Sequence, residues 1–333
     1  MSILFQGVMT IFLGVFTCIA YFVIANFVLD HLIFPRRGEN ISRNINRASM
    51  VRPWIFLFPA LLILTVYLIY PVFETVRLSF IDRDLDNAFV GFANYQLMFD
   101  DPKFWEAMRN NMLWLIIVPA LCTAFGLLAA QLSDRIFWGN IAKSLIFMPM
   151  AISFVGAAVI WKLMYDARPI EQEQIGLLNA LYLHFGGDSP QTWLTNLFWN
   201  NFFLMAIMVW IQTGFAMVIL SAALRGVPED TIEAAIIDGA SPFQIFFKIK
   251  VPQIYSTIIV VWTTITIMVL KVFDIVFALT NGQWETQVLA NYMFNQMFIA
   301  NDWGVSSSAA VMIMLLVFPI LIWNIQNTRK EIM

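Results

Sequence analysis

The chain has 333 residues, of which 60% are hydrophobic and only 12% are charged. A soluble domain carries about 25% charged residues, so this composition excludes an ordinary water-soluble protein. The net charge of −3 gives no general affinity for nucleic acid. Apolar runs of about 20 residues recur, long enough to cross a bilayer as helices, and no extended alternating pattern predicts a barrel. These features predict an all-α integral membrane protein.

Seven hydrophobic segments are expected to span the membrane. They are residues 3–29, 54–80, 110–132, 144–165, 200–224, 252–280 and 304–325. The first span has no basic start and its apolar run is too long for a cleaved signal peptide. We therefore divide the chain into an additional N-terminal membrane helix (1–34), a basic linker (35–53), a second span with an outer loop (54–109), and a core (110–327).

Lysine and arginine in the connecting segments predict the orientation, because they accumulate on the cytoplasmic side. The linker, the turn 133–143, the segment 225–251 and the C-terminus hold Arg36, Arg37, Arg43, Arg47, Arg52, Arg135, Lys143, Arg225, Lys248, Lys250, Arg329 and Lys330. The opposite loops hold Arg83, Lys103, Arg109 and Arg168. This asymmetry predicts an outside N-terminus, a cytoplasmic C-terminus and a cytoplasmic segment 225–251. The basic linker is expected to lie near anionic lipid.

Metal and thiol chemistry is not indicated by the sequence. Cys18 and Cys122 both lie inside apolar runs, without a neighbour at the spacing of metal ligands. His31 and His184 are far apart and lie in expected loops. We therefore expect no metal site, no catalytic residue and no cofactor bound by this chain.

The cytoplasmic segment 225–251 has the local chemistry of two short helices joined by a sharp bend. Pro228 fits the first turn of a helix, with Glu229 and Asp230 favourable at its positive end. Gly239 fits the left-handed position that closes that helix, and Ser241 fits an N-cap of the next one. Pro242 would be the first position of the second helix, and Pro252 would open the sixth span in the same way.

The first short helix is expected to be amphipathic. Ile232, Ala235 and Ile236 share one face at helical spacing, with Ala234 beside it. The small alanine side chains would let this surface enter a groove on another protein. An ordinary surface helix that rests on lipid headgroups has the same pattern, and both interpretations stay open at this point.

Several motifs in order resemble one transporter family. Glu233-Ala234-Ala235, then Gly239, Ile249 and Pro252, resemble the EAA motif of ABC-importer permeases. Val251 and Tyr255 depart mildly from that pattern, where the family has leucine and often a second proline. Residues 238–249 resemble the larger membrane subunit of the maltose importer. Lys271–Asp274 with Leu279–Gly282, and Phe89–Tyr95 with Asp101–Trp105, are similar to sugar permeases, including the alpha-glucoside branch.

The resemblance implies a type I ABC-importer permease fold and a division of labour among subunits. The expected partners are a dimeric cytosolic ATPase, a second and different permease subunit, and a periplasmic or lipid-anchored sugar-binding protein. Contact with the ATPase would fall on Glu233, Ala234, Ala235, Asp238 and Gly239. ATP and Mg²⁺ would be used by the ATPase, because this sequence has no phosphate-binding Gly-Lys pair. The compartment would be the bacterial inner membrane.

The sugar path is expected along the fifth and sixth spans. Polar and aromatic side chains suit sugar hydroxyls and ring faces, so we predict that the path is lined by Gln212, Phe215, Thr264, Met268 and Lys271. Lys271 and Asp274 are three residues apart, which also allows a structural ion pair on one helix face.

Three other classes of function were weighed. An ion-coupled secondary transporter predicts internal repeats and buried acids, and no clear duplication is present. A membrane-embedded enzyme needs a convergent set of catalytic side chains, which the spans lack. An ABC permease for a solute other than a sugar remains open, because the EAA motif concerns the motor and not the cargo.

Overall fold

The computed structural model describes residues 2–35, 41–82, 87–134 and 136–332. The chain forms two compact units, Met1–Glu74 and Thr75–Met333, and each is described by itself. Among the described residues, five helices are long and apolar enough to cross a membrane, or up to seven if each of two bent helix pairs is one span. This agrees with the predicted all-α membrane protein. Of the predicted cytoplasmic basic residues, Arg36, Arg37 and Arg135 lie outside the described residues.

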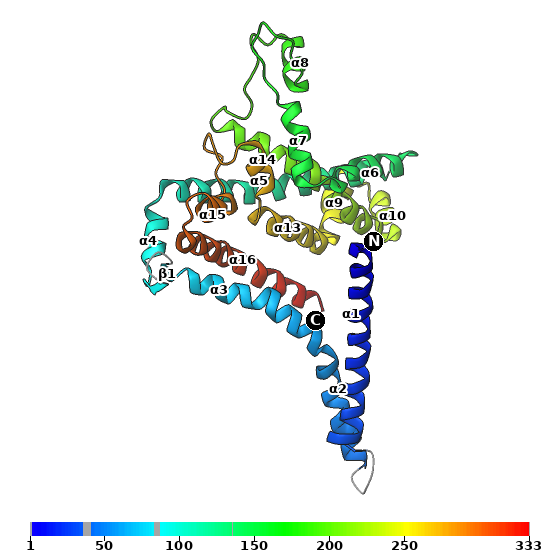
Figure 1. Ribbon diagram of the computed structural model, residues 1–333. Coiled ribbons are helices and arrows are strands. Elements are labelled where there is room, and N and C mark those ends of the chain that lie inside the picture. The colour runs from blue at the N-terminus through cyan, green and yellow to red at the C-terminus, as the bar shows by residue number, and fades with distance from the viewer. Residues whose placement is uncertain (1, 36–40, 83–86, 135, 333) are drawn as a thin grey trace. The chain divides into compact units, whose positions relative to one another are not determined.

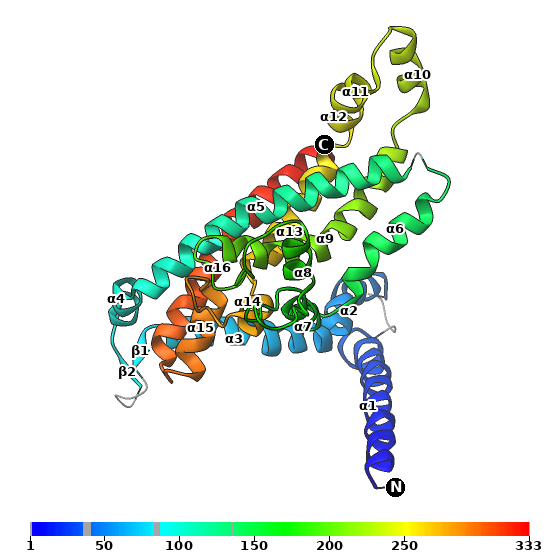
Figure 2. The same ribbon diagram turned by 90° about the horizontal axis from the view of Figure 1, so that it is seen from above.

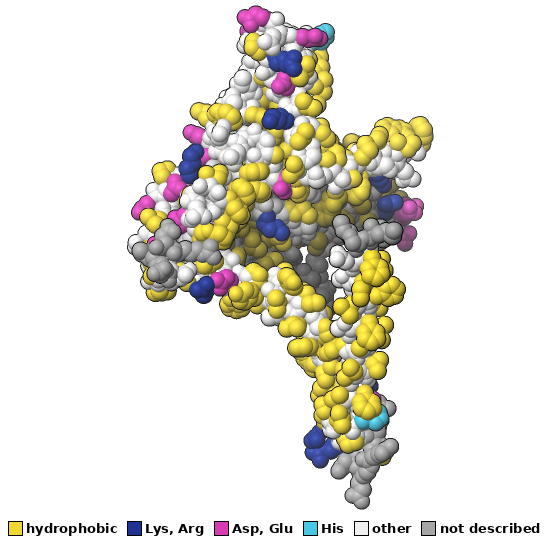
Figure 3. Space-filling model, viewed as in Figure 1, with side chains coloured by type: hydrophobic (Ala, Val, Ile, Leu, Met, Phe, Trp, Pro, Cys, Tyr) yellow, Lys and Arg dark blue, Asp and Glu magenta, His cyan; other side chains and the backbone are white. Residues whose placement is uncertain are grey.

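The first unit is an antiparallel helical hairpin. Helix α1 (Ser2–Phe27) continues as a π-helical turn (Val28–Ile33), and α2 (Ile41–Leu64) continues through a second such turn (Thr65–Ile69). The Tyr21 hydroxyl donates to the carbonyl of Ile55 at 2.8 Å, and Arg52 pairs with Asp30 at 2.7 Å. Hydrophobic side chains cover the hairpin along most of its length, which suits a lipid environment (Figure 3).

Most of the predicted basic linker 35–53 is helical. Residues 41–53 belong to α2, whereas residues 36–40 lie outside the described residues. Residues 41–52 contain no glycine or proline, so nothing in them interrupts a helix, and Pro53 is accommodated inside α2. The polar residues in the first turns of α2 therefore limit its apolar part, although the helix continues through them.

The second unit begins within α3 (Tyr70–Leu78). A two-stranded antiparallel ladder follows, β1 (Ile81–Asp82) with β2 (Ala88–Phe89), in which Ile81 pairs with Phe89. Helices α4 (Ala93–Asp100) and α5 (Pro102–Ser133) come next. The predicted outer loop to residue 109 is too long, because Asp101 caps α5 and Pro102 takes its first position.

The predicted fourth span is not one straight helix. Helix α6 (Gly139–Phe147) ends in a 3₁₀ turn (Met148–Ala151), and α7 (Phe154–Met164) leaves at 104° to it. The next loop carries α8 (Leu177–His184), and Figure 1 shows α7 and α8 extending away from the long helices of this unit. The Asn179 amide fastens the loop by donating to the carbonyls of Asp166 and Gln191 at 2.9 and 3.0 Å.

The remaining helices complete the second unit. They are α9 (Trp199–Arg225), α10 (Glu229–Ile237), α11 (Pro242–Ile245), a π-helical turn (Phe246–Lys250), α12 (Val251–Gln253), α13 (Tyr255–Leu270), α14 (Asp274–Leu279), α15 (Leu289–Phe298) and α16 (Trp303–Ile332). The predicted sixth span is bent by 71° between α12 and α13. Figure 2 shows α10 and α11 projecting at one end of α5 and α9, with α4, β1 and β2 at the other.

The main core lies where α5, α9 and α13 pack together. Its largest fully buried side chains include Trp114, Met217 and Leu220. Two glycines permit close helix approach: a Cβ at Gly126 would collide with Ala216, and one at Gly214 would collide with the backbone at Ile146 and Phe147. A smaller core joins α4, the start of α5, α15 and α16.

Candidate coupling surface and translocation path

Helix α10 ends in a turn that requires a positive φ. Gly239 has a φ of +79°, and its N–H donates to the carbonyl of Ile236 at 3.0 Å. The N–H of Ala240 donates to the carbonyl of Ala235 at 2.9 Å, which completes a Schellman motif. No atom lies within 4 Å of where a Cβ would stand at Gly239, so the constraint lies in the backbone and not in packing. The predicted role of Gly239 in closing this helix is confirmed.

The helix that follows is capped by side chains of its own first turn. The N–H of Gln244 donates to Ser241 Oγ at 3.3 Å, and the N–H of Ser241 donates to Gln244 Oε1 at 2.8 Å. This reciprocal pair is a capping box, with Pro242 at the first helical position as predicted. Pro228 is the N-cap of α10 and not part of its first turn, so that prediction is wrong by one residue.

The two sides of α10 have different surroundings. Ile232 packs against the main core and Ala235 is buried, whereas Ile236 is 59% and Ile237 is 85% exposed. Glu233, Ala234, Asp238 and Gly239 are exposed as well. We call the exposed set Glu233, Ala234, Ile236, Ile237 and Asp238 the coupling face. It combines two large apolar side chains with two acids on a helix whose opposite side is fixed.

The five predicted path residues lie on two neighbouring helices or at the end of one of them. Gln212 and Phe215 lie on α9, Thr264 and Met268 lie on α13, and Lys271 is the exposed C-cap of α13. The structure brings α9 and α13 into contact but records no hydrogen bond among these five side chains. Gln212 is 3% exposed, and its Oε1 has no hydrogen-bond partner among the described residues.

The predicted ion pair between Lys271 and Asp274 is wrong. Helix α13 ends at Leu270, and α14 begins at Asp274 after a residue with φ of −139°. The i, i+3 spacing places two side chains on one face only within a continuous helix. Among the described ion pairs, none joins these two residues.

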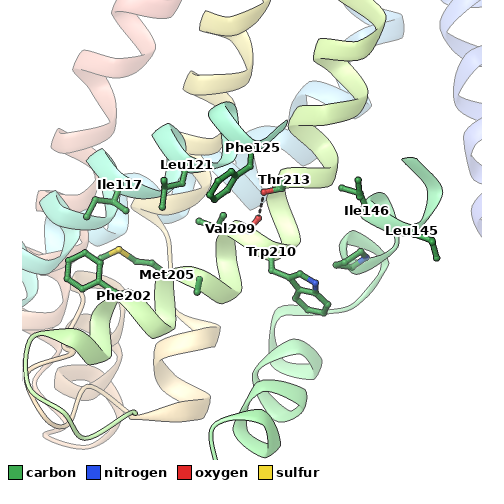
Figure 4. A pocket seen from close by; sticks show the side chains of 12 residues that line it. Ile117, Leu121, Phe125, Leu145, Ile146, Phe202, Met205, Val209, Trp210 and Thr213 are labelled. Carbon is green, nitrogen blue, oxygen red and sulfur yellow. Dashed lines mark hydrogen bonds between the residues drawn. The ribbon is translucent and has the colours of Figure 1, made fainter. Parts of the chain in front are cut away.

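A cavity of about 650 Å³ lies between α5, α6 and α9. Its walls are mostly apolar and aromatic, with Phe125 of α5 beside Thr213 of α9, and Trp210 of α9 adds a further aromatic wall (Figure 4). The Thr213 hydroxyl donates to the carbonyl of Val209 at 2.6 Å, as the dashed line in Figure 4 shows. None of the five predicted path residues lines this cavity, because Gln212 and Phe215 lie on another side of α9.

A group of asparagines that the sequence analysis missed holds the loop between α14 and α15. Asn110 of α5 donates to the carbonyls of Glu285 and Gln287 at 2.9 and 2.8 Å. Asn200 and Asn201 of α9 donate to the carbonyls of Trp284 and Glu285 at 2.6 and 3.1 Å. The signal was an Asn-Asn pair at residues 110–111 and another at 200–201, each near the start of a long apolar run.

No group of three or more His, Cys, Asp or Glu side chains in the described part of the chain is arranged to hold a metal ion. Cys18 is exposed and Cys122 is buried, and both are free thiols. Neither cysteine therefore contributes a disulfide to the sites described above.

Comparison with known proteins identifies the family. The profile described as "Binding-protein-dependent transport system inner membrane component" matches residues 122–329. The alpha-glucoside transport system permease protein AglF of Rhizobium meliloti is 61% identical over 335 residues, and 99% of each chain is covered. The osmoprotective compounds uptake permease protein GgtC of Synechocystis is 50% identical over 277 residues, which cover 83% of this chain and 99% of the relative.

The fold agrees with the same family. A bacterial ABC transporter that imports the acidic polysaccharide alginate has a chain with a TM-score of 0.74 and 18% identity, covering 88% of this chain and 99% of that one. The matched profile includes α10, both bent helix pairs and most of the residues that line the cavity of Figure 4. This chain therefore belongs to the family of binding-protein-dependent transport system inner membrane components, as a membrane-spanning, non-catalytic permease subunit of an ABC importer.

Proposed function

We propose that this permease imports alpha-glucosides or closely related sugars, as one half of a pore made with a second, different permease chain. The observation that carries the proposal is the 61% identity to an alpha-glucoside permease over nearly the whole chain. The trehalose/maltose permease protein MalF of Thermococcus litoralis, 30% identical over 302 residues, adds support. A second candidate cargo is an osmoprotective compound, which the 50% identity to GgtC favours.

The coupling face is proposed to dock on a cytosolic ATPase dimer. The excess of Lys and Arg in the segments near α10 supports a cytoplasmic position for that end, with the N-terminus outside and the C-terminus inside. Ile236 and Ile237 stand exposed where an apolar groove on a partner would cover them. ATP and Mg²⁺ would act on the partner, and the permease itself would hold no cofactor.

Alternating access is proposed to use two interruptions of the apolar helices. These are the 104° bend between α6 and α7 and the break between α13 and α14, and α7 packs against α14. Backbone groups freed at such breaks are tolerated where they line a cavity or protein. Gln212, a buried amide with an unpaired oxygen, would meet sugar hydroxyls when the second permease completes the path. Lys271, exposed at the α13–α14 break, is proposed to lie at the wall of the same path.

Uptake by the reconstituted importer tests the proposal. The permease, its sibling and its ATPase would be placed in vesicles with the binding protein outside and ATP inside. We expect ATP-dependent accumulation of labelled maltose or trehalose, with compatible osmolytes such as glycine betaine as the comparison. Accumulation of the osmolyte without the sugars would overturn the sugar assignment in favour of the second candidate.

A further inference from the structure

Three helices of the second unit meet at a polar junction beside the base of α10. Lys143 of α6 forms an ion pair with Asp134, the C-cap residue of α5. Its Nζ also donates to Ser221 Oγ of α9 at 2.7 Å. Ser221 Oγ lies 3.3 Å from each carboxylate oxygen of Asp134, so the hydroxyl donates to the acid while it accepts from the lysine. The three side chains close a triangle that we call the junction.

The junction is partly shielded from water. The side chains of Lys143 and Asp134 are 15% and 23% exposed, and Ser221 is 1% exposed. Surface ion pairs contribute little because water and salt screen them, whereas shielded pairs with full hydrogen bonding resist separation. Removing one member would leave the other charge without its counter-ion, so the three helices are held as a unit here.

The turn that brings α6 back to α5 is equally constrained. A Cβ at Gly139 would collide with the carbonyl oxygen of Ser133, so the chain passes close to the end of α5. Lys143 follows Gly139 by one helical turn, which directs it toward Asp134 and α9. Helix α6 has nine residues and ends at the 104° break before α7. Lys143, the middle residue of α6, therefore ties this helix to the end of α5 and to α9.

The junction lies on the covalent route from the coupling face into the spans. Helix α9 is unbroken from Trp199 to Arg225, and α10 begins at Glu229. Arg225 Nε donates to the carbonyl of Ser221 at 3.3 Å, one turn before the helix ends. A displacement of α10 therefore reaches α9 at Ser221, where the junction joins it to α6.

We propose that Lys143 is a positioning residue for transport: through Asp134 and Ser221 it transmits movement of α10 to α6, and so to the break before α7. The proposal rests on the proposed docking of α10 on the ATPase, and it assigns to these three residues no contact with nucleotide or cargo. Without the lysine, α9 moves with the ATPase while α6 lags behind, so ATP is hydrolysed with less transport.

The test measures molecules transported per ATP hydrolysed in vesicles that contain the complete importer. Lys143→Met is expected to keep the ATPase in the purified complex and to lower this ratio by about tenfold, within the range of typical coupling energies. Lys143→Arg should keep most of the ratio. The double variant Lys143→Asp with Asp134→Lys restores the opposite charges, with Ser221 between them, and should recover it. Lys162→Met, which removes an exposed lysine from α7, is the matched control.

The outcomes separate this inference from the proposed function. If Lys143→Met transports with an unchanged ratio while the ATPase stays bound, the positioning role is overturned and docking by α10 stands. If Lys143→Met fails to assemble, the charge-exchanged variant decides. If the charge-exchanged variant recovers both assembly and the number of molecules transported per ATP, the proposal is supported. If it recovers assembly alone, the proposal is overturned. If the unmodified permease holds no ATPase, the proposed docking itself fails.

Discussion

Gln212 is one of several buried polar residues with a side-chain atom that lacks a hydrogen-bond partner among the described residues. Its side chain is almost fully buried in α9, yet Oε1 finds no partner among the described residues. An unsatisfied buried polar group costs about 1–3 kcal/mol, and Thr213 next to it avoids that cost by donating to its own helix. This unfavourable free energy is consistent with a Gln212 Oε1 that accepts a hydrogen bond from a molecule outside this chain.

Substituting Gln212 by leucine separates a transport role from a structural one. We expect Gln212→Leu to leave the melting temperature of the purified permease complex unchanged or slightly higher, since the unpaired oxygen is removed. Sugar uptake should fall about tenfold, as when a site loses a hydrogen bond to its ligand. Ser144→Ala in α6 is the control, and normal uptake by Gln212→Leu would remove this residue from the path.

Gly239 allows a test in which no side-chain contact is disturbed. A Cβ there meets no neighbouring atom, so Gly239→Ala changes only the cost of the left-handed backbone, by roughly 1–2 kcal/mol. The end of α10 should refold locally, and ATPase binding should weaken. Gly239→Asn, which tolerates this conformation better, should retain more binding, and Gly226→Ala at a φ of −78° should retain nearly all. Equal binding by all three variants would contradict the role of the bend.

The loop between α14 and α15 shows how an element can be held by its neighbours. Asn281, Trp284 and Glu285 all have positive φ, which non-glycine residues rarely adopt. The side-chain amides of Asn110 and Asn201 hold this strained loop by donating hydrogen bonds to its carbonyl groups. Arg109 adds an ion pair to Glu285 at 3.3 Å. We call Asn110, Asn201 and Arg109 the clamp. These residues fix a loop conformation that the loop sequence alone would not select.

Removing one clamp residue should loosen that loop. Asn110→Ala deletes two hydrogen bonds and leaves two carbonyls of the loop without these donors, at a cost of about 2 kcal/mol. We expect the melting temperature to fall by a few degrees and a protease to cleave the loop faster. Asn140→Ala, at an exposed position, is the control. An unchanged cleavage rate in Asn110→Ala would show that the clamp does not hold the loop.

Elements whose signals are local could be predicted from the sequence, and elements set by packing could not. Gly239 and Ser241 act within a few residues of themselves, so their roles were readable from residue type and spacing. The break before α7 was hidden by an unbroken apolar run, although Ser153 caps α7 by accepting from Gly156 at 3.1 Å. The break between Lys271 and Asp274 is hidden for the same reason, because hydropathy does not report where a helix is interrupted.

At the scale of the whole molecule, the second unit separates two surfaces at opposite ends of its long helices. The coupling face projects at one end of α5 and α9 (Figure 2). The loop that contains Trp284 is held by Asn110 of α5 and Asn200 of α9, in the halves of these helices that are remote from α10. Helices α5 and α9 connect these ends, and the broken pair α6–α7 branches from them. Under the proposed function, the end with the coupling face would meet the ATPase and the other end would receive cargo.

Site-specific crosslinking tests that central claim directly. A photoreactive benzophenone amino acid would replace Ile237 in one variant and Trp284 in another, each within the complete importer supplied with binding protein. We predict that the Ile237 position crosslinks to the ATPase and that the Trp284 position does not. Failure of the Ile237 position to capture the ATPase in an assembled, active complex, or capture of the ATPase by the Trp284 position, would contradict it.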